Sequence, residues 1–586
     1  MFNAGIKLSA SPKAYSLDQD KAISPLETVR RVRERLAALP LSILAHTTRI
    51  DNNRLGIPVF LSVCGDDARQ VMPTRKQMGK GASPEQAEAS ALMELMERYG
   101  FFSFWERLPG AIHAPWSKAE KMFGDNLIPI SEICEACHDA IPADTARKIL
   151  ELRAWTFVPC LRVADGKSVF APLDLFKMLG EFNGSSAGNT DVESLLQGAC
   201  ELVERHVCCI VDRERPVTST ISQSRDSLQN PLLLELLEKF TSQGIQVILK
   251  DFSLGMPVPT VAAIAWDPTT FPDQSEIVFT AGSATSPVKA AIRALTEVAQ
   301  LAGDFNSNAC YEASGLPKFG RLEELEPFSK GPVVPLHSLP SIESNDMLVE
   351  LQSLAEKLRT LGYDLYAVST TNPETQVPTH YCFVPGFHFR ERDSNASLGM
   401  FTGRMISEEA TPGEAENAFA ELEKAYPDNH FLPFYRGMLA LRQEKCEEAR
   451  DFFLKAEALQ PDNDSRALAA FYHAYSFSLD NDWHSAVDGF GRAVRLCPDM
   501  KEYRNMFGVC LFKLGRYAEA AGQFQEILDR LDKGSVMDIQ NLGMCYKELG
   551  KIALARHFLQ AALVIDPGLD RAREALETLA QEWPHD

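Results

Sequence analysis

Hydrophobic and polar residues along roughly the first 400 positions follow the mixed pattern of a protein with both helices and strands. Short apolar runs that are rich in β-branched residues predict strands, as in IPVFLSVCG, VPTVAAIAW and HYCFVPGF. Between them lie alanine- and leucine-rich stretches whose apolar residues recur at helical spacing. We therefore expect an α+β domain in this part of the chain.

The last third of the chain carries a repeat. Proline recurs at Pro427, Pro461, Pro498 and Pro567, with gaps of 34, 37 and 69 residues. Other residues keep the same phase relative to these prolines: Ala415, Ala449, Ala486 and Ala555 twelve positions before; Phe419, Phe453, Phe490 and Leu559 eight before; and Ala456, Ala493 and Ala562 five before. A unit without its proline, residues 501–533, has Gly508, Ala520 and Phe524 in matching phase.

This repeat indicates one antiparallel helix pair per period, because small residues let helices approach and proline ends the second helix. The pattern resembles the tetratricopeptide repeat over roughly residues 411–582, and a plain helical bundle is the alternative. We expect an α+β domain at residues 1–408 and an all-α helical solenoid at 409–586. Such arrays present a concave surface to a peptide or protein, so we assign partner binding to the repeats and look upstream for chemistry.

Composition limits the classes of function. The chain has 586 residues, with 59 Lys and Arg against 80 Asp and Glu, which gives a formal charge of −21. An acidic balance argues against general binding of nucleic acid or of anionic membranes. No apolar stretch is long enough to span a bilayer, and the N-terminus does not resemble a signal peptide. We expect a cytoplasmic protein that binds neither nucleic acid nor membrane, and we expect a homodimer.

Three of the predicted helices share a set of polar residues on one face. They are SPEQAEASALMELMERYG with Ser90, Glu94, Glu97 and Arg98, DVESLLQGACELVERH with Gln197, Glu201, Glu204 and Arg205, and KAAIRALTEVAQ with Arg293, Glu297 and Gln300. In the first two helices these residues fall at i, i+4, i+7 and i+8, and the third repeats the first three positions. Taken singly, such a pattern usually marks a solvated face with local ion pairs.

Three copies with small or apolar neighbours indicate buried acids instead. Buried carboxylates need partners, and Mg²⁺ is a partner that commonly bridges carboxylates to phosphates. Small-residue segments precede the helices, at Gly79–Gly81, at 186–190 and at Gly282–Ser283. A turn of this kind opening onto a helix N-terminus is suited to anions, although each alone is consistent with an ordinary loop. The chain has no glycine-rich phosphate loop of the G-x-x-x-x-G-K-[ST] type.

The segments GKGASPEQAEASALMELMERY, SSAGNTDVESLLQGACELVER and RALTEVAQ resemble, in order and spacing, the three signature segments of the YcaO family. The resemblance covers about residues 20–395, and with the repeats it is similar to the stand-alone bacterial type. It implies an ATP-binding fold in which glutamates hold Mg²⁺ and the triphosphate. The matching residues for nucleotide binding are Lys21, Thr28, Ser90, Glu94, Glu97, Asn189, Glu193, Glu201, Glu204, Arg205, Glu297 and Gln300. Of these, the resemblance implies Glu94, Glu97, Glu193, Glu201, Glu204 and Glu297 as metal ligands.

Two departures bear on the reaction. His388 stands where many members have an acid, and the chain ends in QEWPHD rather than in the proline-rich tail of cyclodehydratases. Both argue against azoline formation and leave the ATP site intact.

The resemblance implies an enzyme that uses ATP and Mg²⁺ to activate a backbone amide oxygen of a peptide or protein, by phosphoryl or adenylyl transfer. A nucleophile then adds, in a cyclodehydratase or a thioamide-forming reaction, and no catalytic side chain is assigned. The alternative is an accessory factor for another enzyme, such as one that methylthiolates a small-subunit ribosomal protein, with the repeats as adaptor.

Overall fold

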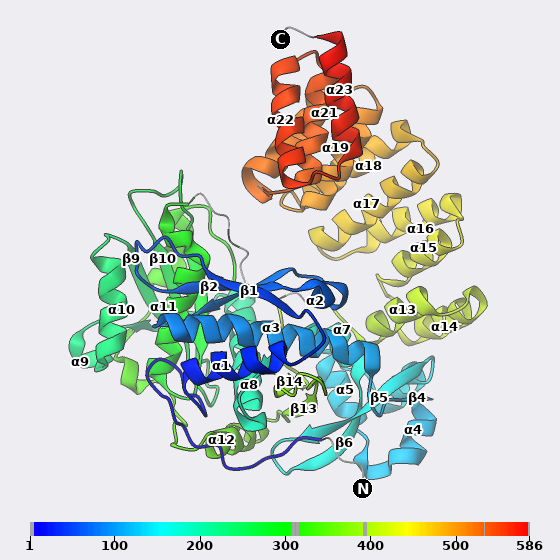
Figure 1. Cartoon of the computed structure of the whole chain (residues 1–586). Coiled ribbons are helices and arrows are strands. Elements are labelled where there is room, and N and C mark those ends of the chain that lie inside the picture. The colour runs from blue at the N-terminus through cyan, green and yellow to red at the C-terminus, as the bar shows by residue number, and fades with distance from the viewer. Residues whose placement is uncertain (1–4, 308–310, 312–315, 391–394, 533, 584–586) are drawn as a thin grey trace. The chain divides into compact units, whose positions relative to one another are not determined.

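The chain forms two compact units, residues Met1–Leu398 and Gly399–Asp586, in the computed structural model (Figure 1). The structure describes all residues except 1–4, 308–310, 312–315, 391–394, 533 and 584–586. Helix α13 (Leu398–Glu409) begins where the two units meet in the sequence. The boundary predicted between residues 408 and 409 falls at the C-terminal end of that helix.

Within the described residues, the strands of the first unit form three sheets. The first is antiparallel and joins β1 (Leu44–Arg49), β2 (Val59–Cys64) and β3 (Lys76–Lys80). The second has the order β11 (Val278–Ser283), β10 (Thr260–Trp266), β9 (Gln246–Asp251), β8 (Thr220–Ile221) and β12 (Val333–Val334). The third has the order β4 (Ile112–Pro115), β5 (Ala154–Arg162), β13 (Tyr366–Ser369), β14 (Thr379–Phe383) and β7 (Ser185–Ala187), and β6 (Lys167–Pro172) pairs with β5. The three strands predicted from apolar runs are β2, β10 and β14.

Three long helices lie against these sheets: α3 (Pro84–Arg107), α8 (Asp191–Glu214) and α11 (Pro287–Ala302). Helix α3 packs on β2 and β3, α8 on β7 and β14, and α11 on β10 and β11. Their sheet-facing residues are small or aliphatic, such as Ala91 and Leu95 of α3, and these side chains are fully buried. This apolar packing holds the polar face of each helix in a fixed direction.

Shorter helices surround the sheets of the first unit. They are α1 (Pro25–Ala37), α2 (Asp66–Val71), α4 (Trp116–Phe123), α5 (Ile130–Ala136), α6 (Ala143–Leu150), α7 (Leu173–Gly180), α9 (Arg225–Leu228), α10 (Pro231–Thr241) and α12 (Met347–Thr360), with 3₁₀ turns at Gly124–Asn126, Gly303–Phe305, Leu322–Ser329 and Leu336–Ser338. Helix α1 packs on α3, and α12 packs on α8. The observed fold confirms the predicted α+β class.

The second unit is helical throughout its described residues, and consecutive helices pack on one another (Figure 1). The helices after α13 are α14 (Pro412–Ala425), α15 (Leu432–Arg442), α16 (Cys446–Leu459), α17 (Asn463–Leu479), α18 (Trp483–Leu496), α19 (Lys501–Lys513), α20 (Tyr517–Glu526), α21 (Val536–Glu548), α22 (Ile552–Ile565) and α23 (Asp570–Glu582), with a π turn at Ile527–Leu531. The in-phase residues Ala449, Phe453 and Ala456 are fully buried, and Pro461 follows the end of α16. The helix-pair repeat predicted from the sequence is thereby confirmed.

None of the helices in the described part of the chain is both long and apolar enough to cross a membrane.

Candidate functional site

The three long helices begin in the same way. Each follows a strand and a small-residue segment, and each has an N-cap in extended conformation, Ser83, Thr190 and Ser286. The side chains of Ser83 and Thr190 accept hydrogen bonds from the backbone N–H three residues later, which is the usual N-cap arrangement. Counting from these caps, the candidate residues fall at equal distances in all three helices. They are Ser90, Gln197 and Arg293 at seven residues, Glu94, Glu201 and Glu297 at eleven, and Glu97, Glu204 and Gln300 at fourteen.

In each of the three strand–helix units, a glycine lets the strand end lie close to the helix backbone. A Cβ on Gly79 would lie 2.0 Å from the backbone nitrogen of Ala91, and one on Gly188 would lie 2.3 Å from that of Ser194. A Cβ on Gly282 would lie 2.6 Å from the backbone nitrogen of Ala294. The predicted glycine turns are therefore mainly contact points between strand ends and helices.

The carboxylates of α3 and α8 face one another. Burial raises the pKa of Glu97 well above its usual value, Arg98 opposes the shift, and the nearby carboxylates of Glu201 and Glu94 add to it. Burial likewise raises the pKa of Glu94 and of Glu201, with Arg98 and Arg205 respectively as the main opposing cations. Acidic groups from two helices thus repel each other in one place, which favours a cation between them.

Basic side chains lie among these acids. Lys80, the last residue of β3, forms an ion pair with Glu297 of α11. Burial, together with the nearby Arg293, lowers the pKa of Lys80 to about 7, while Glu204 and Glu94 oppose that shift. The Lys80–Glu297 pair therefore links the first sheet to the third long helix.

Two further contacts connect α8 with the β11–α11 unit. The backbone N–H of Ser283 donates to Glu204 Oε2 at 2.7 Å, and Arg293 Nη1 donates to Gln197 Oε1 at 2.9 Å. Together with Arg205 Nε, which lies 3.7 Å from Glu201 Oε1, they fix the polar face of α8.

The N-terminal segment reaches the start of α8. Lys21 Nζ lies 3.4 Å from Glu193 Oε1, and the backbone N–H of Ala22 donates to Glu193 Oε2 at 2.9 Å. Asn189 Nδ2 also donates to Glu193 Oε1, at 3.0 Å, and Thr28 Oγ1 donates to Asn189 Oδ1 at 3.1 Å. Four of the predicted residues, 21, 28, 189 and 193, are therefore joined by direct contacts.

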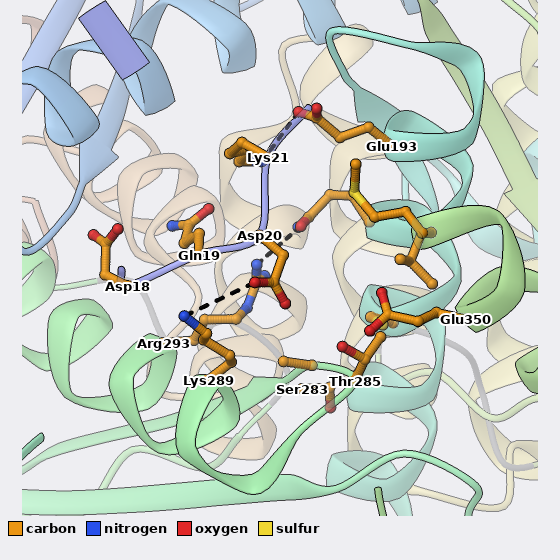
Figure 2. Close-up of a pocket in the computed structure, with 15 residues that line it drawn as sticks. Asp18, Gln19, Asp20, Lys21, Glu193, Ser283, Thr285, Lys289, Arg293 and Glu350 are labelled. Atoms are coloured by element: carbon orange, nitrogen blue, oxygen red, sulfur yellow. Dashed lines mark hydrogen bonds and ion pairs between the residues drawn. The ribbon is translucent and has the colours of Figure 1, made fainter. Parts of the chain in front are cut away.

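Figure 2 shows a cavity beside this group. It is lined by Asp18, Gln19, Asp20, Lys21, Glu193, Leu196, Gln197, Cys200, Ser283, Ala284, Thr285, Lys289, Arg293, Met347 and Glu350. The lining thus comes from the N-terminal segment, the first half of α8, the end of β11 with the turn that follows it, the first half of α11 and the start of α12. Glu201 and Glu204 follow on α8, within the next two turns beyond Gln197 and Cys200.

The structure thus places the predicted residues in two neighbouring groups, the Lys21–Glu193 group and the glutamates. Ser90 and Gln300 are half-buried at the matching helix positions, and no hydrogen bond or ion pair ties either side chain to them among the described residues. Sequence reasoning omitted Lys80 and Arg293 from the candidate site. Both carried a signal, because Lys80 lies between two glycines and Arg293 has the helix position of Ser90 and Gln197.

These residues fit ATP and Mg²⁺. Arg98 Nη1 and Arg293 Nε are buried and have no hydrogen-bond partner among the described residues, so donors suited to phosphate are available. No group of three or more His, Cys, Asp or Glu residues in the described part of the chain is close enough to hold a metal ion by itself. Magnesium usually takes one or two carboxylates together with substrate phosphates. Carboxylates that lie beside arginine donors suited to phosphate match that coordination preference.

Comparisons with known proteins show which family the chain belongs to. Residues 78–388 match the family model described as YcaO cyclodehydratase, ATP- and Mg²⁺-binding. Residues 412–464 match a tetratricopeptide repeat model, and residues 452–527 match a model of anaphase-promoting complex subunit 3. The repeat assignment made from the sequence is therefore confirmed by an independent match.

An uncharacterised protein of Methanothermobacter thermautotrophicus is 27% identical over 413 residues, which cover 62% of this chain and 94% of that protein. The ribosomal protein S12 methylthiotransferase accessory factor YcaO of Escherichia coli is 29% identical over 211 residues, 32% of this chain and 35% of that protein. The match therefore spans about a third of the E. coli protein.

A solved heterocyclase in complex with substrate and cofactor has the same fold, with a TM-score of 0.53 and 18% identity over 66% of this chain and 54% of that one. Because the family model covers more than half of the residues, this chain belongs to the YcaO family of ATP- and Mg²⁺-binding proteins.

Proposed function

We propose that this protein is an ATP-dependent enzyme that activates a backbone amide of a peptide or protein for post-translational modification. One observation carries the proposal: glutamates at equal positions of three helices converge beside a cavity that the Lys21–Glu193 pair borders. Acids gathered in such half-buried positions are costly unless a cation and phosphates complete them. The tetratricopeptide repeats support a polypeptide as substrate or partner, because such arrays bind extended chains.

The chain's own residues have separate tasks in this proposal. Glu94, Glu97, Glu201, Glu204 and Glu297, with Glu193 at the start of α8, would supply the carboxylates that hold Mg²⁺, and the bound ion would in turn bind the phosphates. The Arg98 and Arg293 guanidinium groups would donate hydrogen bonds to phosphate oxygens.

The remaining predicted residues complete the nucleotide site: Lys21, Thr28, Ser90, Asn189, Arg205 and Gln300. Bound ATP supplies the phosphoryl or adenylyl group that makes the amide oxygen a leaving group, and Mg²⁺ neutralises phosphate charge. Positioning is the main contribution of the protein, so no side-chain nucleophile is needed.

The experiment compares proteins from cells that carry the wild-type chain with those from cells that carry the Glu201→Gln variant, by intact-mass spectrometry. We expect at least one protein whose mass depends on the wild-type chain, and purified enzyme with that protein should convert ATP to ADP or AMP in step with the mass change. A mass change that persists with Glu201→Gln would contradict the proposal.

A second candidate is an accessory factor that assists another enzyme, and the E. coli relative, which is described as an accessory factor, favours it. A chain ending at residue 408 separates the two. Intrinsic ATP turnover that survives while the cellular modification is lost would indicate that the repeats act as an adaptor. The full-length Glu201→Gln variant gives a second indication. If the cellular modification is lost while the separate modifying enzyme is still active when assayed alone, the result would also indicate an accessory role.

A further inference from the structure

The polar face of α3 continues past the glutamates to Arg98 and Trp105. Arg98 Nε lies 3.6 Å from Glu97 Oε1. The charge of Arg98 also lies near Glu94 and Glu201. Trp105 follows Arg98 by seven residues, which is close to two full turns, so both side chains leave the helix on the same side. Along the helix axis the two residues are about 10 Å apart.

Helix α7 and the loop after it contact both of these side chains. The Phe182 ring covers the Arg98 guanidinium group, whose central carbon lies 4.2 Å from the ring centroid. Lys177 Nζ lies 4.3 Å from the centroid of the Trp105 ring. Lys177 is part of α7, and Phe182 belongs to the loop between α7 and β7. Two cation–π contacts therefore join this segment to the C-terminal half of α3.

The loop that carries Phe182 is held against the third sheet. The backbone N–H of Ser185 donates to the carbonyl oxygen of Phe182 at 3.0 Å. A Cβ on Gly184, which has a φ of 84°, would lie 2.3 Å from the carbonyl oxygen of Cys382 in β14. The Phe182 side chain nevertheless stays 42% exposed. A single exposed ring is common on protein surfaces, so its neighbours decide what it can do.

Lys177 is a half-buried cation that lacks an acidic partner. No hydrogen bond or ion pair ties its ammonium group to any residue that the structure describes, and it lies over the Trp105 ring instead. Burial lowers the pKa of Lys177 from its usual value. Asp174, one turn earlier on α7, lies 3.5 Å from Arg153 and accepts from the backbone N–H of Thr156. A cation withdrawn from water without a counter-ion costs free energy, so a ligand that brings a carboxylate is favoured here.

This surface is separate from the cavity of Figure 2. The lining of that cavity includes neither Arg98 and Trp105 of α3 nor Lys177 and Phe182, and its share of α8 ends at Cys200. Arg98 nevertheless stands among the glutamates that would hold Mg²⁺ and, through it, the phosphates. A molecule bound over Lys177 and Phe182 would therefore lie beside the phosphates without occupying the cavity.

An extended peptide fits the dimensions of this surface. Such a chain rises about 3.3 Å per residue, so the distance of about 10 Å from Arg98 to Trp105 corresponds to about three residues. Phe182 lies at the level of Arg98, and Lys177 lies at the level of Trp105. The chain has a formal charge of −21, so a lysine without a carboxylate is a local exception that an acidic side chain complements.

We propose that Lys177 and Phe182 bind the peptide substrate, Lys177 by pairing with a carboxylate of the peptide and Phe182 by packing against an apolar side chain about three residues away. The inference rests on the proposed function, because it places the amide to be activated between those two side chains and beside Arg98. It names the substrate as a segment that carries an acidic and an apolar residue close together.

The test titrates short peptides of glycine and serine, capped at both ends, that carry one Phe and one Glu about three residues apart. Matched peptides have Gln or Lys in place of Glu. The full-length protein is labelled with 5-fluorotryptophan, and the fluorine resonance of Trp105, identified by its loss in Trp105→Phe, reports a ligand at Lys177. The wild-type chain should bind the Glu peptide about tenfold more tightly than the Gln peptide.

Three variants separate the two contacts. In Lys177→Met the preference for Glu over Gln should shrink to about twofold or less, and Lys177→Glu should prefer the Lys peptide. Phe182→Ala should weaken the Glu and Gln peptides to a similar degree and keep the preference between them. Lys357→Met is the matched control at an exposed lysine of α12, and it should behave like the wild type.

Calorimetric titration with Mg²⁺–ATP, carried out without peptide, keeps this inference apart from the proposed function. Lys177→Met should bind the nucleotide like the wild type, and melting curves check that each variant folds. A wild-type chain that binds none of the peptides, binds Glu and Gln peptides equally, or responds only to inorganic phosphate would overturn the surface. So would a wild-type preference that survives in Lys177→Met. A preference for the Glu peptide in a chain that binds no nucleotide would support the surface and contradict the proposed function.

Discussion

Glu204 Oε2 accepts a 2.7 Å hydrogen bond from the backbone N–H of Ser283, which joins two of the three strand–helix units across 79 residues of sequence. A carboxylate that accepts a backbone hydrogen bond is held in place before any ligand arrives. The relationship gives Glu204 two roles that substitutions can separate, one in structure and one in charge.

Glu204→Gln keeps an oxygen that can accept from Ser283 and removes the charge. We expect this variant to melt close to the wild-type temperature and to bind Mg²⁺–ATP more weakly. Glu204→Leu removes both the acceptor oxygen and the charge. The lost hydrogen bond should destabilise the first unit by about 1 to 3 kcal/mol. Thermal unfolding and calorimetric titration of both variants check the two effects, and equal melting temperatures for Gln and Leu would contradict the structural role.

The three helix sets of the candidate site could be predicted from local sequence because their residues repeat at fixed helix positions. Glu94, Glu201 and Glu297 each lie one turn before a second polar residue, and helical geometry alone puts such pairs on one face. The repeat region could be predicted in the same way, because an alanine and a bulky apolar residue, such as Ala449 and Phe453, recur at the same spacing in successive periods. Short-range periodicity therefore predicted both the fold class and the three sets of glutamates.

Contacts between distant segments could not be obtained in this way. The Lys80–Glu297 pair depends on how β3 lies beside α11, and the contact of Lys13 with Glu350 spans 337 residues. No spacing rule links such residues, because tertiary packing decides which segments meet. Arg293 was visible as a helix residue, yet its place in the site became clear only with the structure.

Gly79→Ala tests the close approach of β3 to α3. A Cβ there would meet backbone atoms of Ala91 and Ala87 at 2.0 and 2.3 Å, so the strand or the helix must shift. We expect a loss of about 3 kcal/mol in the stability of the first unit, together with weaker nucleotide binding. Gly320→Ala is the control, because a Cβ at that exposed glycine meets no atom within 4 Å. Equal melting temperatures for the two variants would count against the packing.

The raised pKa values of Glu94, Glu97 and Glu201 predict a pH dependence. Below about pH 4.5 these carboxyls are protonated in both folded and unfolded chains. As the pH rises, the unfolded chain ionises first, so the ligand-free protein loses the stability that these groups contribute as the pH passes their raised folded pKa values. Mg²⁺–ATP requires the ionised carboxylates, so its stabilising effect should grow over the same window.

Melting temperatures between about pH 5 and pH 8, with and without saturating Mg²⁺–ATP, check this behaviour. Glu201→Gln removes one of the titrating groups and should flatten the pH dependence of the ligand-free protein. A ligand-induced rise in melting temperature that is the same at every pH would contradict the prediction.

Phe524→Ala tests the repeat unit that lacks its proline. The Phe524 ring is buried and lies where a Cβ on Gly508 would meet it at 2.7 Å. Its removal leaves a cavity, and we expect a loss of about 3 to 5 kcal/mol in the second unit. Hydrogen exchange should show faster opening of α19 and α20. Leu554→Ala, at a half-exposed position of α22, should show little change, and similar exchange in both variants would contradict the packing.

The central claim is that glutamates on three helices bind Mg²⁺–ATP, and calorimetric titration of ATP with and without Mg²⁺ tests it most directly. The variants are Glu201→Gln and, as a control on the same helix, Glu214→Gln at an exposed position. We predict that Glu214→Gln binds like the wild type, while Glu201→Gln loses about tenfold or more in affinity and most of its Mg²⁺ dependence. Unchanged affinity and Mg²⁺ dependence in Glu201→Gln would contradict the account.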